Sequence, residues 1–325
     1  MFKQPLVSVL MPLYNKVAYV AETIESVLNQ TYPNIELIIV DDGSTDGSLI
    51  IANGYVSERV VVIKQENKGG SAARNTAFLH SKGDFIQYLD ADDILDARKI
   101  EKQVEILRGQ TDVLTIAKGK DFIVQKNGDW QVLERPLLSK NYADMNCFLL
   151  DEVKQAALVH SWLIPRNWVE KAGKWDETMT IFEDRDFYLR LVPLASRIVF
   201  CPDSICYWRL PTSSAHLSQR INQIDFEGAL DYFLRFERLL VPKNKEARVV
   251  LACLFKKLLV KAYTQKPIVA EIRARCLRLG LVPDCSRNLV IRLLPRLFGV
   301  RIAFQILLLK IIFDRQFSMK GWIKK

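Results

Sequence analysis

Three carboxylates follow one apolar, strand-like run of the chain. Asp90, Asp92 and Asp93 come directly after DFIQYL at 84–89. Carboxylates at the end of a rigid strand suit a hard divalent cation, which can in turn bridge the oxygens of a diphosphate. The same residues could instead cap a helix that begins near Asp96. The spacing alone therefore predicts either a metal site or a helix start.

A second acidic pair, Asp41 and Asp42, ends the apolar run IELIIV. A carboxylate at this place could accept a hydrogen bond from the N3–H group of a uracil ring. The alternative is again local, because Ser44 or Asp46 could cap a following helix. The pair therefore predicts a base-binding position only if other nucleotide contacts lie nearby.

Several other residues are of types that contact nucleotides. Tyr14, after the first apolar run, could stack on a base, and Glu22 either faces the same crevice or lies on a solvated helix face. The segment NKGGSAARN at 67–75 joins a glycine turn to a helix start, whose free N–H groups and positive dipole end suit phosphate oxygens. Arg74 in this segment adds a positive charge.

A third acidic pair lies far along the chain, where Glu183 and Asp184 precede an amphipathic stretch. A carboxylate at the start of a helix can act as a general base if it reaches a substrate hydroxyl. It can equally be a capping residue that interacts with the helix dipole. Both interpretations place the pair on the first turn of a helix.

The elements that would position these groups alternate between strand and helix patterns. Because alternating strands and helices give parallel sheets flanked by helices, ligands are expected beyond the carboxyl ends of the strands, where the acidic clusters should converge. An Asn-Gly pair in KNGDW at 126–130 predicts a hairpin. We expect strands at 6–11, 35–40, 59–64 and 84–89, and helices at 18–30, 46–56 and 71–81.

Charge divides the chain into two unlike parts. Residues 235–325 carry 21 Lys and Arg against 5 Asp and Glu, a net of +16, whereas residues 1–234 carry 25 against 32, a net of −7. An acidic front suits a metal, and a basic tail suits an anionic surface such as lipid. We expect a catalytic domain at 1–215, a basic and mainly helical region at 216–325, and no nucleic-acid partner.

The basic tail is not expected to cross a bilayer. Its longest uncharged run, Ile302–Leu309, is far shorter than the about 20 residues that a spanning helix needs. Basic residues interrupt the apolar ones at near-helical intervals, which is typical of a helix lying on anionic lipid. The alternative is a helical bundle packed on the catalytic domain. The basic residues concerned are Arg292, Arg296, Arg301 and Lys310.

The amino terminus and the cysteines favour a cytoplasmic protein. MFKQPLVSVLMPLYN has one basic residue and an apolar run interrupted by Ser8 and Pro12, which is atypical of a signal peptide. The cysteines form no CxxC pair, so we expect buried, reduced thiols in a reducing compartment. With the basic tail, this predicts a cytoplasmic protein, peripheral at the inner face of the cell membrane. The cysteines are Cys147, Cys201, Cys206, Cys253, Cys276 and Cys285.

Five segments, taken in order, resemble the family 2 glycosyltransferases. They are VSVLMPLYNKVAYVAETIESVLNQTY, ELIIVDDGSTDGS, NKGGSAARNTA, GDFIQYLDADD and GKWDE…FEDRDFYLRL. The resemblance covers roughly residues 5–215. It implies the α/β, type A glycosyltransferase fold, a Rossmann-like and mostly parallel sheet flanked by helices, here with a C-terminal helical extension.

The resemblance also implies roles for individual residues. Those of the nucleotide-sugar site are Pro12, Tyr14 and Asp42 at uracil, Glu22 in the same crevice, Arg74 near the diphosphate, Asp90 at ribose or metal, and Asp92 on the metal. Asp184 matches the catalytic base. YWRLPTSSAH at 207–216 is similar to the loop that closes over the diphosphate, with Arg209 as its anion contact.

The activity implied is that of a metal-dependent, inverting glycosyltransferase of the hexosyltransferase type. It would use Mn²⁺ or Mg²⁺ and move a sugar from a nucleotide-sugar, with UDP favoured, to a hydroxyl of a glycan or lipid-linked acceptor in bacterial surface-polysaccharide synthesis. The sequence lacks the Q-x-x-R-W motif of processive synthases, which favours single transfers. His160 and Trp162 are either acceptor contacts or core residues. The alternative is a non-catalytic nucleotide-sugar-binding or scaffold protein with the same fold.

Overall fold

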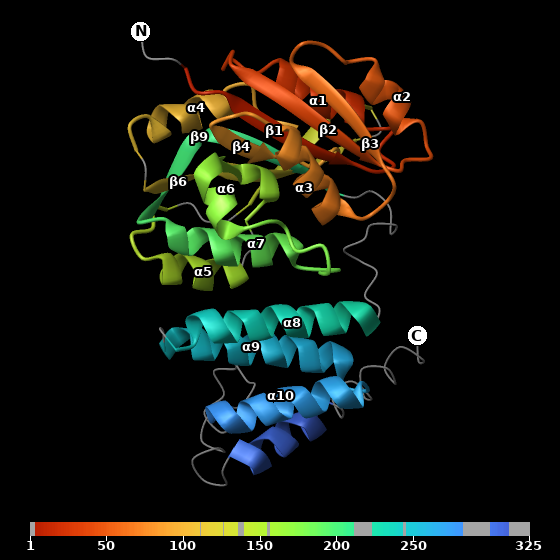
Figure 1. Ribbon diagram of the computed structural model, residues 1–325. Helices are drawn as coiled ribbons and strands as arrows, with labels where there is room; N and C mark the ends of the chain where they lie inside the picture. The colour runs from red at the N-terminus through yellow and green to blue at the C-terminus, as the bar shows by residue number, and fades with distance from the viewer. Residues whose placement is uncertain are drawn as a thin grey trace. The chain divides into compact units, whose positions relative to one another are not determined.

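The computed structural model describes residues 4–110, 112–125, 127–135, 140–154, 157–210, 223–242, 245–281 and 300–311. Contacts within the chain define two compact units. The first, the sheet unit, comprises residues 1–179 and 183–219. The second, the helical unit, comprises residues 180–182 and 220–325. Figure 1 shows the strands in the first unit and the long helices of the second.

The sheet unit is built on a nine-stranded sheet, as far as the described residues show. Its strand order is β3-β2-β1-β4-β8-β6-β9-β5, and β7 pairs with β6. The strands are β1 Val7–Leu13, β2 Ile35–Asp42, β3 Val60–Gln65, β4 Phe85–Tyr88, β5 Ile94–Leu95, β6 Val113–Val124, β7 Trp130–Glu134, β8 Trp162–Pro165 and β9 Arg197–Arg209.

Helices connect and cover these strands. In α1 the buried residues Val20, Thr23, Ile24 and Val27 recur at helical spacing, which gives one apolar face. In α3 small residues are buried, so the helix packs closely on β1 and β2. The helices of this unit are α1 Val20–Leu28, α2 Ser48–Asn53, α3 Gly70–His80, α4 Lys99–Leu107, α5 Met145–Lys154, α6 Arg166–Ala172 and α7 Glu183–Leu191, with short 3₁₀ turns at Val159–Ser161 and Val192–Leu194.

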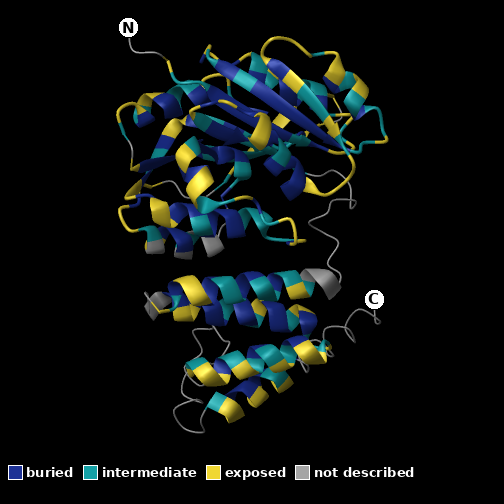
Figure 2. Cartoon of the chain, in the orientation of Figure 1, coloured by how far each residue is buried: buried dark blue, intermediate teal, exposed yellow. Residues whose placement is uncertain are grey.

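The predicted parallel half of the sheet is present. β1 lies between β2 and β4 and is parallel to both, and β3 is parallel to β2. β1 and β2 are buried almost throughout, as the dark central strands in Figure 2 show, and their continuous apolar sequences are typical of strands covered on both faces. Each expected strand and helix of the first 90 residues forms, with ends shifted by at most three residues.

The second half of the sheet is mixed rather than parallel. β8 is antiparallel to β4 and to β6, while β9 is parallel to β6 and antiparallel to β5. The expected hairpin forms between β6 and β7, where Gly128 takes the positive φ of 89° that the turn needs. The parallel neighbours β6 and β9 are separated along the chain by α5, α6 and α7, which supply the long crossover that a parallel pair needs.

The helical unit contains α8 Gln223–Leu240, α9 Lys245–Ala262, α10 Lys266–Leu279 and a helix at residues 300–311. α8 packs on α9, and α10 contacts both. Residues 180–182 belong to this unit: the ring of Phe182 lies 5.5 Å from that of Tyr232 on α8. In the described part of the chain, no helix is long and apolar enough to cross a membrane.

The cysteines only partly match the expectation of buried thiols. Cys201, Cys206 and Cys276 are buried, but Cys147 on α5 is exposed and Cys253 is intermediate. None of these five forms a disulfide with another described residue, and Cys285 lies outside the described residues. The expectation was therefore wrong for Cys147, whose helix faces solvent at that position.

Candidate functional site

The carboxyl ends of β1, β2 and β4 meet at one edge of the sheet, because the three strands are parallel neighbours. The loop after β1 is bonded to the loop after β2. Asn15 N donates to Ser44 Oγ (3.1 Å), and Thr45 N donates to Asn15 Oδ1 (2.8 Å). Lys16 N donates to Ser48 Oγ (2.7 Å). The two loops therefore form one fixed border of the site.

Arg74 of α3 lies among acidic residues from two parts of the chain. Its Nη2 donates to Asp90 Oδ1 (2.7 Å), and its guanidinium lies 4.6 Å from the centre of the Trp175 ring. Burial opposes its charge, but Asp90, Glu183 and Asp184 together raise the pKa of Arg74. One buried guanidinium therefore interacts with acidic residues that are far apart in the sequence.

The segment before α7 is held by an asparagine that the sequence patterns did not single out. Asn75 Oδ1 accepts from Trp175 N (2.9 Å), and Asn75 Nδ2 donates to Trp175 O (3.0 Å) and to Glu177 Oε1 (2.8 Å). Asn75 ends the NKGGSAARN motif and Trp175 lies in the GKWDE segment. In the sequence, the one indication that these two segments lie close together was that both occur in the motif order of the family 2 glycosyltransferases.

Asp184 lies on the first turn of α7, partly buried. Its Oδ1 accepts from the neighbouring Arg185 N (2.8 Å). Burial raises the pKa of Asp184, and burial together with the Asp184 charge raises the pKa of Glu183. Phe182, just before the helix, has a positive φ of 60°, unusual for a bulky residue.

Asp92 is paired with Lys16, whose Nζ lies 2.5 Å from Asp92 Oδ2. The loop after β1 therefore brings a positive charge to the carboxylate expected to bind metal. The Lys16 charge also helps to lower the pKa of Asp90, after the larger effect of Arg74, both acting against burial. Lys16 was missed in the sequence because one lysine in a loop carries no pattern.

Asp93 and Arg209 hold the turn at residues 90–93 in place. Arg209 N donates to Asp93 Oδ1 (2.9 Å) and Arg209 Nε donates to Asp92 O (2.9 Å). Burial, then the charge of Asp92, raises the pKa of Asp93 well above its ordinary value. The side chains of Asp90, Asp92 and Asp93 contact other elements, and α4 begins at Lys99 with no side-chain cap, so the helix-capping alternative for this cluster was wrong.

The guanidinium of Arg209 already contacts other side chains of the chain. Its Nη2 donates to Glu22 Oε2 (2.5 Å), and its guanidinium lies 4.4 Å from the centre of the Phe122 ring. Residues 207–209 end strand β9 and are not part of a loop, whereas residues 211–216 lie outside the described residues. The role of Arg209 as an anion contact remains a prediction.

His160 and Trp162 are core residues, and the interpretation as acceptor contacts was wrong. Both side chains are buried, and Trp162 stacks on Tyr188 with ring centres 4.9 Å apart. His160 Nδ1 lies 3.2 Å from Asp93 Oδ2. Burial lowers the pKa of His160 to about 3. This histidine is therefore neutral and lies against Asp93 in the core.

The proposed base-binding residues differ in exposure. Tyr14 is 47% exposed and available for stacking, and Pro12 is intermediate. Asp42 is 3% exposed and accepts bonds from Gln65 Nε2 (2.7 Å), Lys68 N (2.9 Å) and Gly69 N (2.8 Å). Asp42 therefore fastens the glycine turn before α3 with three accepted bonds, and one of the about four acceptor positions of its carboxylate remains for a ligand.

The described residues offer a divalent cation part of a coordination shell, which a phosphate ligand would complete. Among the described residues no group of three or more His, Cys, Asp or Glu side chains could hold a metal ion. Mg²⁺ commonly binds through one or two carboxylates plus the phosphates of a substrate, which matches Asp92 with Asp90. Both carboxylates carry a protein cation here, so a bound metal would compete with Lys16 or Arg74.

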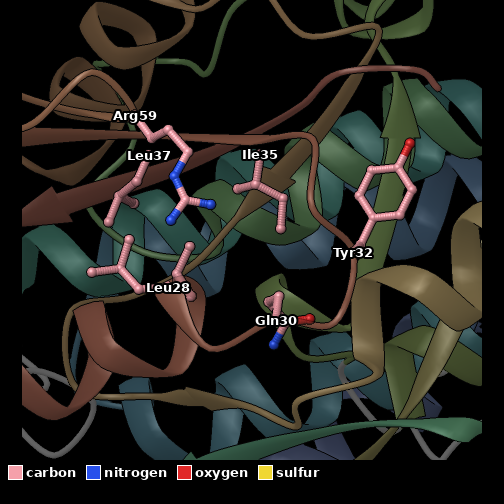
Figure 3. A pocket seen from close by; sticks show the side chains of 7 residues that line it. Leu28, Gln30, Tyr32, Ile35, Leu37 and Arg59 are labelled. Atoms are coloured by element: carbon pink, nitrogen blue, oxygen red, sulfur yellow. The ribbon is translucent and has the colours of Figure 1, made fainter. Parts of the chain in front are cut away.

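A separate pocket lies at the opposite end of β2 (Figure 3). It is lined by Gln30 and Arg59 with apolar residues such as Ile35 and Leu37. Ile35 and Leu37 are near the amino end of β2, whereas Asp42 is at its carboxyl end. The amide of Gln30 is satisfied by the chain, donating to Asp96 O (2.7 Å). This pocket is therefore not part of the acidic site.

Known sequences similar to this chain are named as glycosyltransferases. The model of "Glycosyl transferase family 2" matches residues 8–172. Glycosyltransferase GlyG of Streptococcus pneumoniae is 32% identical over 228 residues, 64% of this chain and 72% of GlyG. An uncharacterized glycosyltransferase of Rickettsia bellii is 34% identical over 59% of this chain, but the match spans only 28% of that protein. TuaG of Bacillus subtilis, named a putative teichuronic acid biosynthesis glycosyltransferase, is 45% identical over 32% of this chain and 42% of TuaG.

Comparison with solved structures supports the same fold. The crystal structure of S. aureus TarS 1–349 in complex with UDP-GlcNAc gives a TM-score of 0.71, covering 96% of this chain and 92% of that one. The structure of TarS 1–349 with UDP gives 0.68. At 17% identity the likeness shows the fold alone. This chain therefore has the α/β, type A glycosyltransferase fold with C-terminal helices.

Proposed function

The chain belongs to glycosyl transferase family 2, and on that premise we propose that it transfers one sugar from a UDP-sugar to an acceptor hydroxyl with inversion. The proposal rests above all on the grouping of Asp90, Glu183 and Asp184 around Arg74, where a base and a cation lie close enough to interact electrostatically. A sugar donor between them would meet a proton acceptor on one side and positive charge on the other.

Asp184 is the proposed general base. As the acceptor oxygen forms its bond to C1 of the donor sugar, Asp184 takes the hydroxyl proton and the bond from C1 to the nucleoside diphosphate breaks. The pKa of Asp184, raised by burial, makes this carboxylate a stronger proton acceptor than an exposed aspartate. Attack and departure on opposite sides of C1 give inversion.

The charge that develops on the diphosphate needs stabilisation from the other side. Arg74 supplies one fixed positive charge, held by Asp90 and Trp175. Mn²⁺ or Mg²⁺ held by Asp92 would supply further positive charge to the leaving phosphate. Asp93, Arg209 and His160 would keep the Asp92 carboxylate in position.

UDP is the proposed nucleotide because the fold resembles TarS, two of whose crystal structures contain UDP-GlcNAc or UDP. Tyr14 is exposed beside the site and would stack on the base, with Pro12 and Asp42 at the uracil edge. We therefore infer the chemical class of the donor. The sugar and the acceptor are to be found by screening UDP-sugars against glycans and lipid-linked glycans.

The helical unit is proposed to meet an anionic membrane surface from the cytoplasmic side. In the helix at 300–311, Ile302, Ile306 and Leu309 are exposed and recur at helical spacing, so they form an apolar stripe. Arg301 and Lys310 lie beside it. An apolar stripe with flanking cations suits the boundary of anionic lipid, where a lipid-linked acceptor for surface polysaccharide would be found.

Calorimetric titration of UDP into the purified protein tests this function without knowledge of the sugar. We expect UDP to bind, more tightly with Mn²⁺ than without it. Asp92→Ala should remove most of the Mn²⁺ dependence, because Asp92 would be the main protein ligand of the metal. Asp184→Asn should keep it, because a base acts mainly in the transition state. Failure of the wild-type protein to bind UDP with and without Mn²⁺ would refute the proposed donor.

A further inference from the structure

Lys16 and Arg74 both hold a carboxylate of the site, but they are held very differently themselves. Arg74 is buried, packs on Trp175 and interacts with several acidic residues. Lys16 Nζ has one recorded partner in the described part of the chain, Asp92 Oδ2. The Lys16 side chain is 29% exposed and that of Asp92 is 15% exposed. The lysine end of this pair is therefore the more exposed to solvent.

Hydrogen bonds hold the backbone at Lys16, and an ion pair with Asp92 holds the end of its side chain. Lys16 N donates to Ser48 Oγ (2.7 Å), and Val17 N donates to Asp46 Oδ2 (3.0 Å). Asn15 is held at a positive φ of 51° by its bonds to the loop after β2. The loop therefore fixes the origin of a long, flexible chain whose ammonium can move between nearby anions.

We propose that Lys16 is a displaceable counter-ion of Asp92. When no donor is bound, the Lys16 ammonium neutralises the Asp92 carboxylate. Without the ammonium, the negative charge of Asp92 would be uncompensated beside Asp90 and Asp93. When a divalent cation and the diphosphate bind, the cation takes Asp92 Oδ2 and the ammonium moves onto a phosphate oxygen. Lys16 is then a diphosphate contact as well as a competitor of the metal, an inference that rests on the proposed function.

This arrangement makes two predictions of opposite sign for one substitution. Lys16→Met keeps the length of the side chain and removes its charge. Mn²⁺ alone should then bind about 3- to 10-fold more tightly, because no ammonium has to leave Asp92. UDP at saturating Mn²⁺ should bind about 3- to 10-fold more weakly, because a phosphate contact is lost. A merely structural lysine would not give both changes.

Lys102→Met is a matched control. Lys102 on α4 has a similar side-chain exposure, 27%, and it also pairs with a carboxylate, that of Glu105 (3.0 Å). Its substitution removes the same charge and a comparable ion pair away from the site. Mn²⁺ binding is followed by the electron paramagnetic resonance signal of free Mn²⁺, UDP binding by calorimetry, and folding by thermal melting. Lys102→Met should match the wild type in both affinities.

The outcomes separate this proposal from the proposed function. Tighter Mn²⁺ binding with weaker UDP binding in Lys16→Met supports the displaceable counter-ion. Unchanged Mn²⁺ affinity in Lys16→Met, or no Mn²⁺ binding by either protein, would overturn it. If Mn²⁺ binds more tightly to Lys16→Met but the wild type does not bind UDP, the competition with metal stands while the phosphate contact and the proposed donor are both refuted.

Discussion

Lys99 is a fully buried lysine whose charge should change the stability of the sheet unit with pH. Its Nζ donates to Gln87 Oε1 and to Trp162 O (3.2 Å), and burial lowers its pKa from 10.5 to about 7. The unfolded chain keeps the ordinary value. Between about pH 7 and 10.5 the unfolded state therefore binds more protons, and the free energy of unfolding must rise with pH.

The size of the effect follows from the two pKa values. With 10.5 unfolded and about 7 folded, keeping the lysine in the core costs about 4 kcal/mol at pH 7 and about 2 kcal/mol at pH 9. The wild type should therefore gain about 2 kcal/mol from this group over that range. Lys99→Met lacks the titrating group, although it leaves two acceptors without a donor at a cost of roughly 1–3 kcal/mol that does not depend on pH.

Urea unfolding at pH 7, 8 and 9 measures this difference. Tryptophan fluorescence follows the sheet unit, because five of the six tryptophans fall in its residue range. Other titrating groups cancel when Lys99→Met is subtracted from the wild type, and Lys102→Met on the same helix is the control. If the stabilities of wild type and Lys99→Met run parallel from pH 7 to 9, Lys99 is charged in the folded protein and the reasoning fails.

Three further predictions concern catalysis and membrane binding. Asp184→Asn should lower turnover roughly 10²- to 10⁴-fold with the donor found by screening. Because burial raises the pKa of Asp184, wild-type turnover should rise with pH through an acid limb above the usual range of an aspartate. Replacing Ile302, Ile306 and Leu309 by Gln should reduce flotation with vesicles that contain anionic lipid, whereas Val249→Gln, an exposed apolar position on α9, should not.

Clear results would contradict each of these. Wild-type turnover in Asp184→Asn would remove this carboxylate from the chemistry and favour a non-catalytic or differently catalysed reaction. An acid limb at the pKa of an exposed aspartate would mean that the base is solvated. Equal flotation of the triple variant and the wild type would refute a lipid-binding role for the stripe.

Much of the sheet unit could be predicted because its signals are local. A buried parallel strand such as β1 has a mainly apolar sequence, and α1 has apolar residues at helical spacing. Once the first strands are parallel, their carboxyl ends must lie together, which places Asp42 and Asp90 at one edge of the sheet. The mixed half could not be predicted in this way, because the pairing of β8 with β4 and β6 joins distant segments.

The sequence by itself thus determined where the carboxylates would gather, because strand direction and spacing are properties of short segments. Only the tertiary structure decided their partners: Lys16 for Asp92, Arg74 for Asp90 and Arg209 for Glu22. It also placed His160 in the core against Asp93. Charge pairs form between residues that folding brings close, and their burial sets each pKa, so neither can be read from residue types along the chain.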